Sequence, residues 1–203
     1  MEINCLTPVF LLHGLGARPI TLLPLELYLN YQGYKNTYRL SYPVDKLSIN
    51  ASVEWVNNEL LKRVSKEQEI ILIGQSAGGR IANELHTKGW KIKLAIYIGS
   101  PLSGAKLLNQ LESILPTFVR NALYKKPYDD LKIIKKPKIP PHPHHSITMG
   151  WFNTQFDGCV YQNEAKLNQK NHTHLAWSDH RSIFANPRLW WLIVDLIKKY
   201  KIY

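Results

Sequence analysis

The chain has few cysteines, few acidic residues and no long apolar run. Its two cysteines, Cys5 and Cys159, are too few and too far apart for a disulfide framework or a zinc site, so we expect thiols in a reducing compartment. No apolar run approaches the roughly 20 residues that span a bilayer, and no basic segment followed by a cleavable apolar one opens the sequence. These absences predict one domain over residues 1–203 that is cytoplasmic, or exported by a route that leaves no N-terminal mark.

Acidic residues are scarce: 15 stand against 26 lysines and arginines, and the formal net charge is +11. A balance of this kind favours anionic partners, although solubility alone would explain it. Basic residues gather from Arg120 to Lys138, where tyrosine, leucine and isoleucine side chains are interleaved with them. Two interpretations stay open for this segment: peripheral contact with an anionic membrane, or a solvated connection whose apolar residues cover the active-site face. Nucleic acid is not expected, because no binding motif accompanies the charge.

Apolar, β-branched runs alternate with helical patterns along the chain. Strands are predicted at 8–13, 34–42, 69–74, 91–98 and 146–151, and helices at 20–31, 53–64, 76–88 and after Asn186. The alternation predicts an α/β fold, with a mainly parallel sheet of about six strands and helices on both faces. Residues 103–145 break the rhythm and are predicted to form a cap or insertion after the fourth strand. Ligand sites of such sheets lie at the carboxyl ends of the strands.

The sequence Gly74-Gln75-Ser76-Ala77-Gly78 lies between a predicted strand and a predicted helix. This G-x-S-x-G pattern is typical of a nucleophilic serine on a sharp turn, where side chains two positions away on either side would collide with the strand and helix. A plain glycine–serine turn is the alternative, but the strand–turn–helix context favours Ser76 as a nucleophile.

The sequence His13-Gly14-Leu15-Gly16 follows the first predicted strand. An oxyanion hole needs two backbone N–H groups that point at one oxygen. We expect one from Ala77, directly after the nucleophile, and the other from Leu15, where flanking glycines let the backbone bend toward a substrate. His13 is predicted to be a scaffold residue that hydrogen-bonds this loop.

The base and its acid should follow the serine in the order Asp or Glu, then His. His180 lies in a polar turn before the last helix and is the predicted base. Asp157, in "QFDGCV", precedes it by 23 residues and is the predicted acid. Asp179 is disfavoured because adjacent side chains in a turn rarely point at one another, and Asp130, like its neighbour, is interpreted as a surface charge.

The remaining histidines are interpreted as structural. His174 is predicted to be a strand residue that faces the sheet. His142, His144 and His145 lie in a proline-rich stretch, where a solvated loop is favoured over a metal site because neither cysteine nor carboxylate accompanies them.

The motifs "VFLLHGLG", "LIGQSAGGRIANEL", "YIGSPLSGAKL", "DGCV" and "HLAWSDHRSIFANP" together resemble the α/β-hydrolase superfamily. More narrowly, the chain is similar to small bacterial lipase-like hydrolases, and the similarity extends over nearly its whole length. The resemblance implies catalysis by serine, aspartate and histidine in that order, hydrolysis of carboxylic esters, and neither metal nor cofactor. The chain departs from the usual pattern at Gln75, where the family commonly has histidine, and at Ala77, the second variable position of the motif.

Three functions are compatible with these residues. The first is a serine esterase or lipase-like hydrolase acting on a small-molecule or lipid ester, expected to be a monomer. The second is an acyltransferase or amidase that uses the same triad. The third is a non-catalytic module that binds membranes, against which the presence of a candidate for every catalytic role argues.

Overall fold

The computed structural model describes residues 6–107, 110, 130–131, 139–150, 154–168 and 170–200. The basic segment from Arg120 to Lys138 lies outside this range except for Asp130 and Leu131. Most of the predicted insertion at 103–145 also lies outside it.

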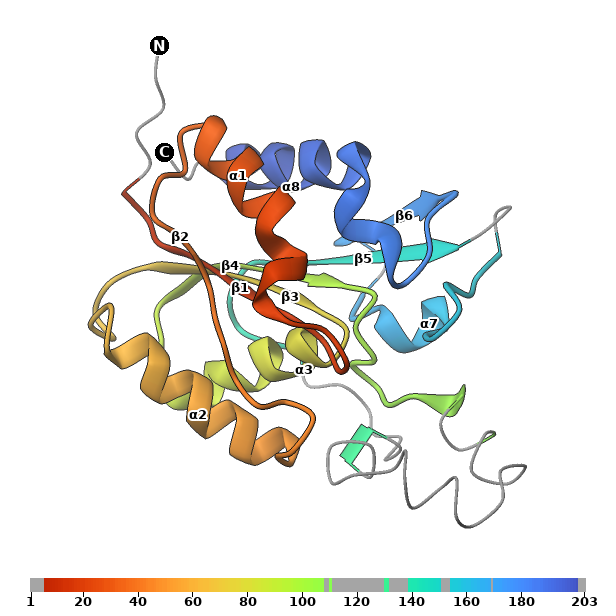
Figure 1. The fold of residues 1–203 in the computed structure, drawn as a ribbon, viewed down its shortest axis with the longest axis horizontal. Coiled ribbons are helices and arrows are strands. Elements are labelled where there is room, and N and C mark those ends of the chain that lie inside the picture. The colour runs from red at the N-terminus through yellow and green to blue at the C-terminus, as the bar shows by residue number, and fades with distance from the viewer. Residues whose placement is uncertain are drawn as a thin grey trace.

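Within the described residues the strands form one parallel six-stranded sheet, which confirms the predicted fold class, and their order is β2-β1-β3-β4-β5-β6 (Figure 1). The sheet lies between two layers of helices, so the central strands are buried on both faces and consist mainly of apolar residues. The strands are β1 (Val9–Leu12), β2 (Thr37–Arg39), β3 (Ile70–Gln75), β4 (Ile92–Ile98), β5 (His144–Gly150) and β6 (His172–Ala176).

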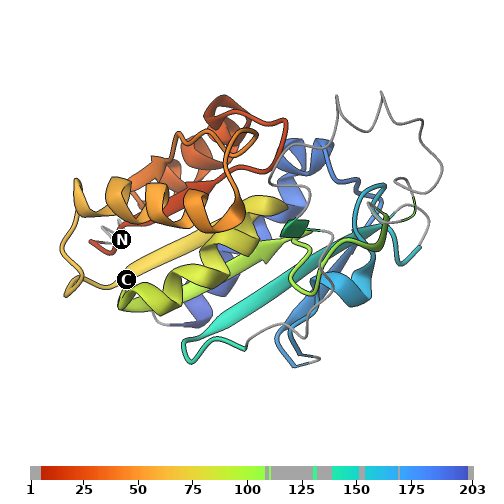
Figure 2. The ribbon, with the colours of Figure 1, turned by 90° about the horizontal axis from the view of Figure 1, so that it is seen from below.

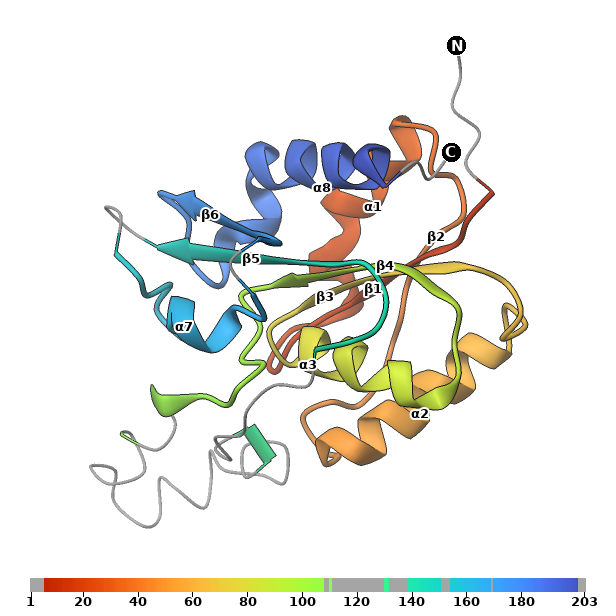
Figure 3. The same cartoon turned by 180° about the vertical axis from the view of Figure 1, so that it is seen from behind.

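Two pairs of long helices cover the two faces of the sheet. The helices α1 (Leu23–Tyr31) and α8 (Pro187–Lys199) pack on one face, and α2 (Ile49–Leu61) and α3 (Ala77–Glu84) pack on the other (Figures 2 and 3). Alternate strand residues supply the two cores, with Leu11 and Ile73 facing α1 and α8, and Leu12 and Leu72 on the opposite side. The short elements are η1 (Pro19–Leu22), η2 (Leu85–Lys88), α7 (Gln162–Ala165) and η4 (Ser182–Ala185).

The predicted helices and strands are present, but several bounds are shifted; the helix predicted at 53–64, for example, is α2 at Ile49–Leu61. The helix predicted at 20–31 divides into η1 and α1, with prolines in the first turn of each, where a missing N–H is tolerated. The helix predicted at 76–88 divides into α3 and η2 and ends at Gly89, whose φ is 77°. The second strand is shorter than predicted, because only Thr37–Arg39 pair with β1 as a strand.

The last helix begins as the sequence predicts. The Asn186 side chain accepts a hydrogen bond from the Arg188 N–H (2.9 Å), and Pro187 takes the first helical position. A cap of this kind contributes about 1 kcal/mol to helix stability. In the described part of the chain no helix has both the length and the apolar character needed to cross a membrane.

The histidines at the start of β5 correct one prediction. His144 and His145 are buried strand residues, not members of a solvated loop. The proline-rich sequence before them favoured the prediction of a loop. In the structure, pairing with β4 begins at Pro143, whose carbonyl accepts a hydrogen bond from the Ala95 N–H (3.0 Å). Burial lowers the pKa of His145 to about 4, so its imidazole is neutral at pH 7, and its Nε2 lies 2.8 Å from the Thr173 hydroxyl of β6.

Asp130 corrects a second prediction, because it is not a free surface charge. Its Oδ2 accepts a hydrogen bond from the Ile49 N–H (2.6 Å) at the first residue of α2. A carboxylate at this end of a helix also interacts favourably with the helix dipole. Asp130 therefore ties the insertion to the main domain.

Candidate active site

The turn between β3 and α3 has the geometry of a nucleophile elbow. Ser76 has φ 53° and ψ −124°, a conformation that costs a non-glycine residue of the order of 1–3 kcal/mol and is concentrated at functional sites. A Cβ atom at Gly78 would lie 2.4 Å from the carbonyl oxygen of Leu12, so only glycine lets α3 approach β1 this closely. The strain and the close packing fix Ser76 at the carboxyl end of β3.

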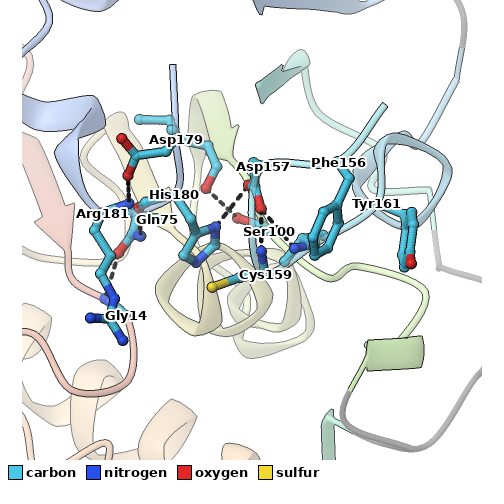
Figure 4. Close-up of polar contacts among 12 residues, drawn as sticks. Gly14, Gln75, Ser100, Phe156, Asp157, Cys159, Tyr161, Asp179, His180 and Arg181 are labelled. Carbon is cyan, nitrogen blue, oxygen red and sulfur yellow. Dashed lines mark hydrogen bonds and ion pairs between the residues drawn. The ribbon is translucent and has the colours of Figure 1, made fainter. Parts of the chain in front are cut away.

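Asp157 and His180 form a buried pair (Figure 4). The distance from His180 Nδ1 to Asp157 Oδ2 is 2.8 Å. The other carboxylate oxygen, Oδ1, accepts the backbone N–H groups of Cys159 (2.9 Å) and Val160 (2.7 Å). The His180 N–H also donates to the Asp157 carbonyl (3.0 Å), so both the backbone and the ring of His180 are held by one residue.

Asp179, the neighbour of His180, is engaged elsewhere. Its carboxylate accepts the backbone N–H groups of Arg181 (2.8 Å) and Ser182 (2.9 Å) and the Ser182 hydroxyl. Figure 4 shows the Asp179 carboxylate joined to Arg181. Burial raises the pKa of Asp179, but these hydrogen bonds and the nearby His180 outweigh it, so the pKa stays below its usual value. The structure therefore brings Asp157, not Asp179, to the His180 ring.

The loop of residues 13–16, here called the HGLG loop, follows β1. His13 Nδ1 lies 3.0 Å from the Gly14 carbonyl oxygen, the His13 ring stacks on Tyr42 at 4.5 Å between centroids, and the Tyr42 hydroxyl donates to the His13 carbonyl. Burial lowers the pKa of His13, which keeps the ring neutral. His13 is thus a scaffold residue of the loop, as predicted.

Of the two residues predicted to supply N–H groups for an oxyanion hole, Ala77 directly follows Ser76 in the chain and Leu15 belongs to the HGLG loop. Ala77 is the first residue of α3, where a backbone N–H has no intrahelical acceptor. Leu15 lines the same cavity as Ser76, and the next residue, Gly16, is fixed by donation of its N–H to Asp45 Oδ1 (2.7 Å). The Asp45 contact was not predicted, because the partners are 29 residues apart.

A cavity lies against the HGLG loop and the elbow that carries Ser76. Its volume of about 480 Å³ is within the range of small-molecule sites. Ser76 and His180 both line it, and the rest of its wall is mainly apolar. Ala105 and Leu131 show that the predicted insertion contributes to the wall. The other lining residues are Leu15, Gly16, Ala17, Thr21, Gln75, Pro101, Cys159, Val160, Arg181 and Phe184.

Three residues that line the cavity were not predicted: Cys159, Arg181 and Phe184. A sequence does not indicate which side chains border a cavity. Among the described residues, no three side chains of His, Cys, Asp or Glu are placed to hold a metal ion.

Neither a scan against models of protein families nor a search of curated proteins found a match to the chain. Solved structures do match. The mature form of Bacillus licheniformis lipase BlEst2 is 14% identical with a TM-score of 0.69, and the match covers 97% of this chain and 93% of the lipase. Mouse α/β hydrolase domain-containing protein 10 is 15% identical with a TM-score of 0.68, over 97% of this chain and 91% of that protein.

A third similar structure is larger than this chain. Phospholipase PlaB from Legionella pneumophila, in complex with thio-NAD, is 12% identical with a TM-score of 0.64, and the match covers 80% of this chain. The chain spans 44% of the length of PlaB. At these identities the similarity concerns the fold, which agrees with the sheet order and the elbow described above. The chain has the α/β-hydrolase fold.

Proposed function

We propose that the protein is a serine hydrolase that cleaves carboxylic esters, with Ser76, Asp157 and His180 as its catalytic triad. One observation carries the proposal. The imidazole that is hydrogen-bonded to Asp157 lines the same cavity as Ser76, the residue held in a strained conformation at the elbow. The names of similar structures, a lipase and a phospholipase, support ester chemistry.

The first step is attack on the ester by Ser76. With Nδ1–H donated to Asp157, the His180 ring accepts the hydroxyl proton at Nε2 as Ser76 Oγ attacks the carbonyl carbon. The two backbone N–H groups that donate to Asp157 Oδ1 hold the carboxylate so that its other oxygen, Oδ2, accepts from His180 Nδ1. Asp157 thereby selects the tautomer and stabilises the imidazolium that forms.

The second element is stabilisation of the tetrahedral intermediate. Its oxyanion lies between the N–H groups of Leu15 and Ala77, at the amino end of α3, where donors are pre-aligned and the partial charge is positive. His180 then returns the proton to the leaving alcohol, and the acyl group stays on Ser76. A water molecule, deprotonated by His180, then attacks the acyl carbonyl carbon. The bond from this carbon to Ser76 Oγ breaks as His180 returns the proton to Oγ, which releases the acid and restores the enzyme.

Hydrolysis of p-nitrophenyl esters over a series of acyl lengths tests the proposal, with Ser76→Ala as the control. A fluorophosphonate probe should label the wild-type protein at Ser76 and leave Ser76→Ala unlabelled. If the folded protein shows neither ester turnover nor labelling, the function is not hydrolysis by this triad.

A further inference from the structure

Gln75, the last residue of β3, joins two loops that come from distant parts of the chain. Its Oε1 accepts the Gly14 N–H (3.1 Å) of the HGLG loop, and its Nε2 donates to the His180 carbonyl (3.1 Å). The partners are 61 and 105 residues away in sequence. The side chain is 7% exposed, so water has little access to either hydrogen bond. Figure 4 shows the amide between its two partners.

The chemistry of the bridge requires an amide. One end must accept a hydrogen bond from an N–H group and the other must donate to a carbonyl, and a glutamine amide provides both. A carboxylate in the same place would direct an acceptor at the His180 carbonyl, and an apolar side chain would leave both backbone groups without partners. A buried backbone group that loses its partner is destabilised by about 1–3 kcal/mol.

The backbone of the HGLG loop is adapted to this contact. A Cβ atom at Gly14 would lie 2.7 Å from Gln75 Oε1 and 2.8 Å from Ser76 Cβ, so the loop approaches the elbow this closely only with glycine. On its other side the loop is held by the Tyr42 hydroxyl, which donates to the His13 carbonyl. The bridge therefore completes a clamp around the segment that carries Leu15.

We propose that Gln75 is a positioning residue that fixes the Leu15 N–H and the His180 ring relative to Ser76. The inference rests on the proposed function, because these groups act as oxyanion donor and base there. Gln75 holds the residue before Leu15 and the backbone of His180, and it is itself the residue before Ser76. Gln75 thus sets the position of the Leu15 N–H and of the His180 ring relative to Ser76.

Three purified variants test the proposal: Gln75→Met, Gln75→Glu and Asn57→Leu. Asn57 is the matched control, because it too is a buried amide (8% exposed) with a hydrogen bond, from Trp90 Nε1 (3.0 Å), but lies on α2 away from the cavity. Each variant is compared with wild type in Tm, in kcat and KM for a p-nitrophenyl ester, and in backbone hydrogen exchange. Exchange is followed for the HGLG loop and for residues 177–181, well below every Tm.

Both Gln75 variants should lower kcat by about 10- to 100-fold with KM changed less than about threefold, since misplacement by about 1 Å can cost a hundredfold in rate. In Gln75→Met, hydrogen exchange should rise in both loops together, because both hydrogen bonds of the side chain are lost. Glutamate, although it preserves the size of glutamine, should not rescue activity, because it cannot donate when ionised. Asn57→Leu should lower Tm and leave kcat and the exchange of both loops at wild-type values.

Unchanged exchange in either loop of Gln75→Met would overturn the bridge, and raised exchange with wild-type kcat would overturn its positioning role. Full activity in Gln75→Glu would show that only the size of the side chain matters. If the wild-type protein hydrolyses no ester, the proposed function is wrong, and the exchange comparison alone then decides whether Gln75 joins the two loops.

Discussion

Gly99 follows β4 and lies next to the Asp157–His180 pair. Its replacement by alanine tests whether the hydrogen bond between these two side chains tolerates displacement. A Cβ atom at this position would lie 2.9 Å from Asp157 Oδ2 and 3.2 Å from His180 Nδ1, the two atoms of the 2.8 Å hydrogen bond. It would also lie 2.5 Å from the terminal methyl group of Met149. The methionine methyl can move aside, but the carboxylate and imidazole cannot move without lengthening their hydrogen bond.

Two terms contribute to the expected loss of stability in Gly99→Ala. Gly99 has φ 51°, and an L-residue in the left-handed region costs about 1–2 kcal/mol. Overpacking of a well-filled site adds about 1–3 kcal/mol. The free energy of unfolding should therefore fall by about 2–5 kcal/mol. In addition, kcat should fall about a hundredfold, because displacement of the pair misaligns the base.

Gly89→Ala is a matched control for the backbone term. Gly89 also has positive φ, 77°, but nothing lies within 4 Å of a Cβ atom built there. This variant should lose about 1–2 kcal/mol of stability and keep wild-type kcat. Urea unfolding and ester hydrolysis measure the two quantities for each variant. If Gly99→Ala loses no more stability than Gly89→Ala and keeps full kcat, the Asp157–His180 pair is either not fixed or not used.

Three further predictions follow from particular contacts. Asp157→Asn should lower kcat by about 10⁴-fold with the fold intact, because the wrong imidazole tautomer is then held; Asp179→Asn should stay active, and the reverse result would reassign the acid. His145 is 6% exposed and its pKa is lowered to about 4, so below pH 6.5 the unfolded chain binds a proton that the folded protein does not. Stability should fall on acidification from pH 6.5 to 4, by up to about 2 kcal/mol at pH 5 from this residue, and urea unfolding of His145→Gln should show a correspondingly weaker pH dependence between pH 7.5 and 5. Asn186→Ala should lose about 1 kcal/mol in the same assay, whereas Asn186→Asp, which retains the acceptor for the Arg188 N–H, should lose much less; equal losses would exclude the capping role.

The parallel sheet and the elbow were predictable because their causes are local. Apolar β-branched runs indicate buried strands, and helical periodicity indicates the helices that cover them. Asn186 and Pro187 indicate the start of the last helix, because the Asn186 side chain accepts a hydrogen bond from the Arg188 N–H only two residues later. The G-x-S-x-G pattern is likewise local, because the glycines that permit the sharp turn at Ser76 lie within the same five residues. The resemblance to a known superfamily supplied the order in which an acid and a histidine should follow Ser76.

The sequence could not settle features that depend on pairing between distant residues. The Asp130 contact with the start of α2 joins positions 81 residues apart, and the proline-rich stretch gave no sign that His144 and His145 enter a strand. The strand forms there because β4 offers an unpaired edge, as the hydrogen bond from Ala95 to Pro143 shows.

By itself, then, the sequence determined the layers, the turn that carries Ser76 and a short set of candidates for its partners. The sequence predicted Asp157 rather than Asp179 as the acid, and in the tertiary structure Asp157 is hydrogen-bonded to the His180 ring. Only the tertiary structure decided that Gln75 links this histidine to Gly14. The physical reason is that periodicity and turn chemistry constrain only neighbouring residues. The direction of a side chain in a site is set by packing and by hydrogen bonds, which form after strands far apart in sequence have been brought side by side.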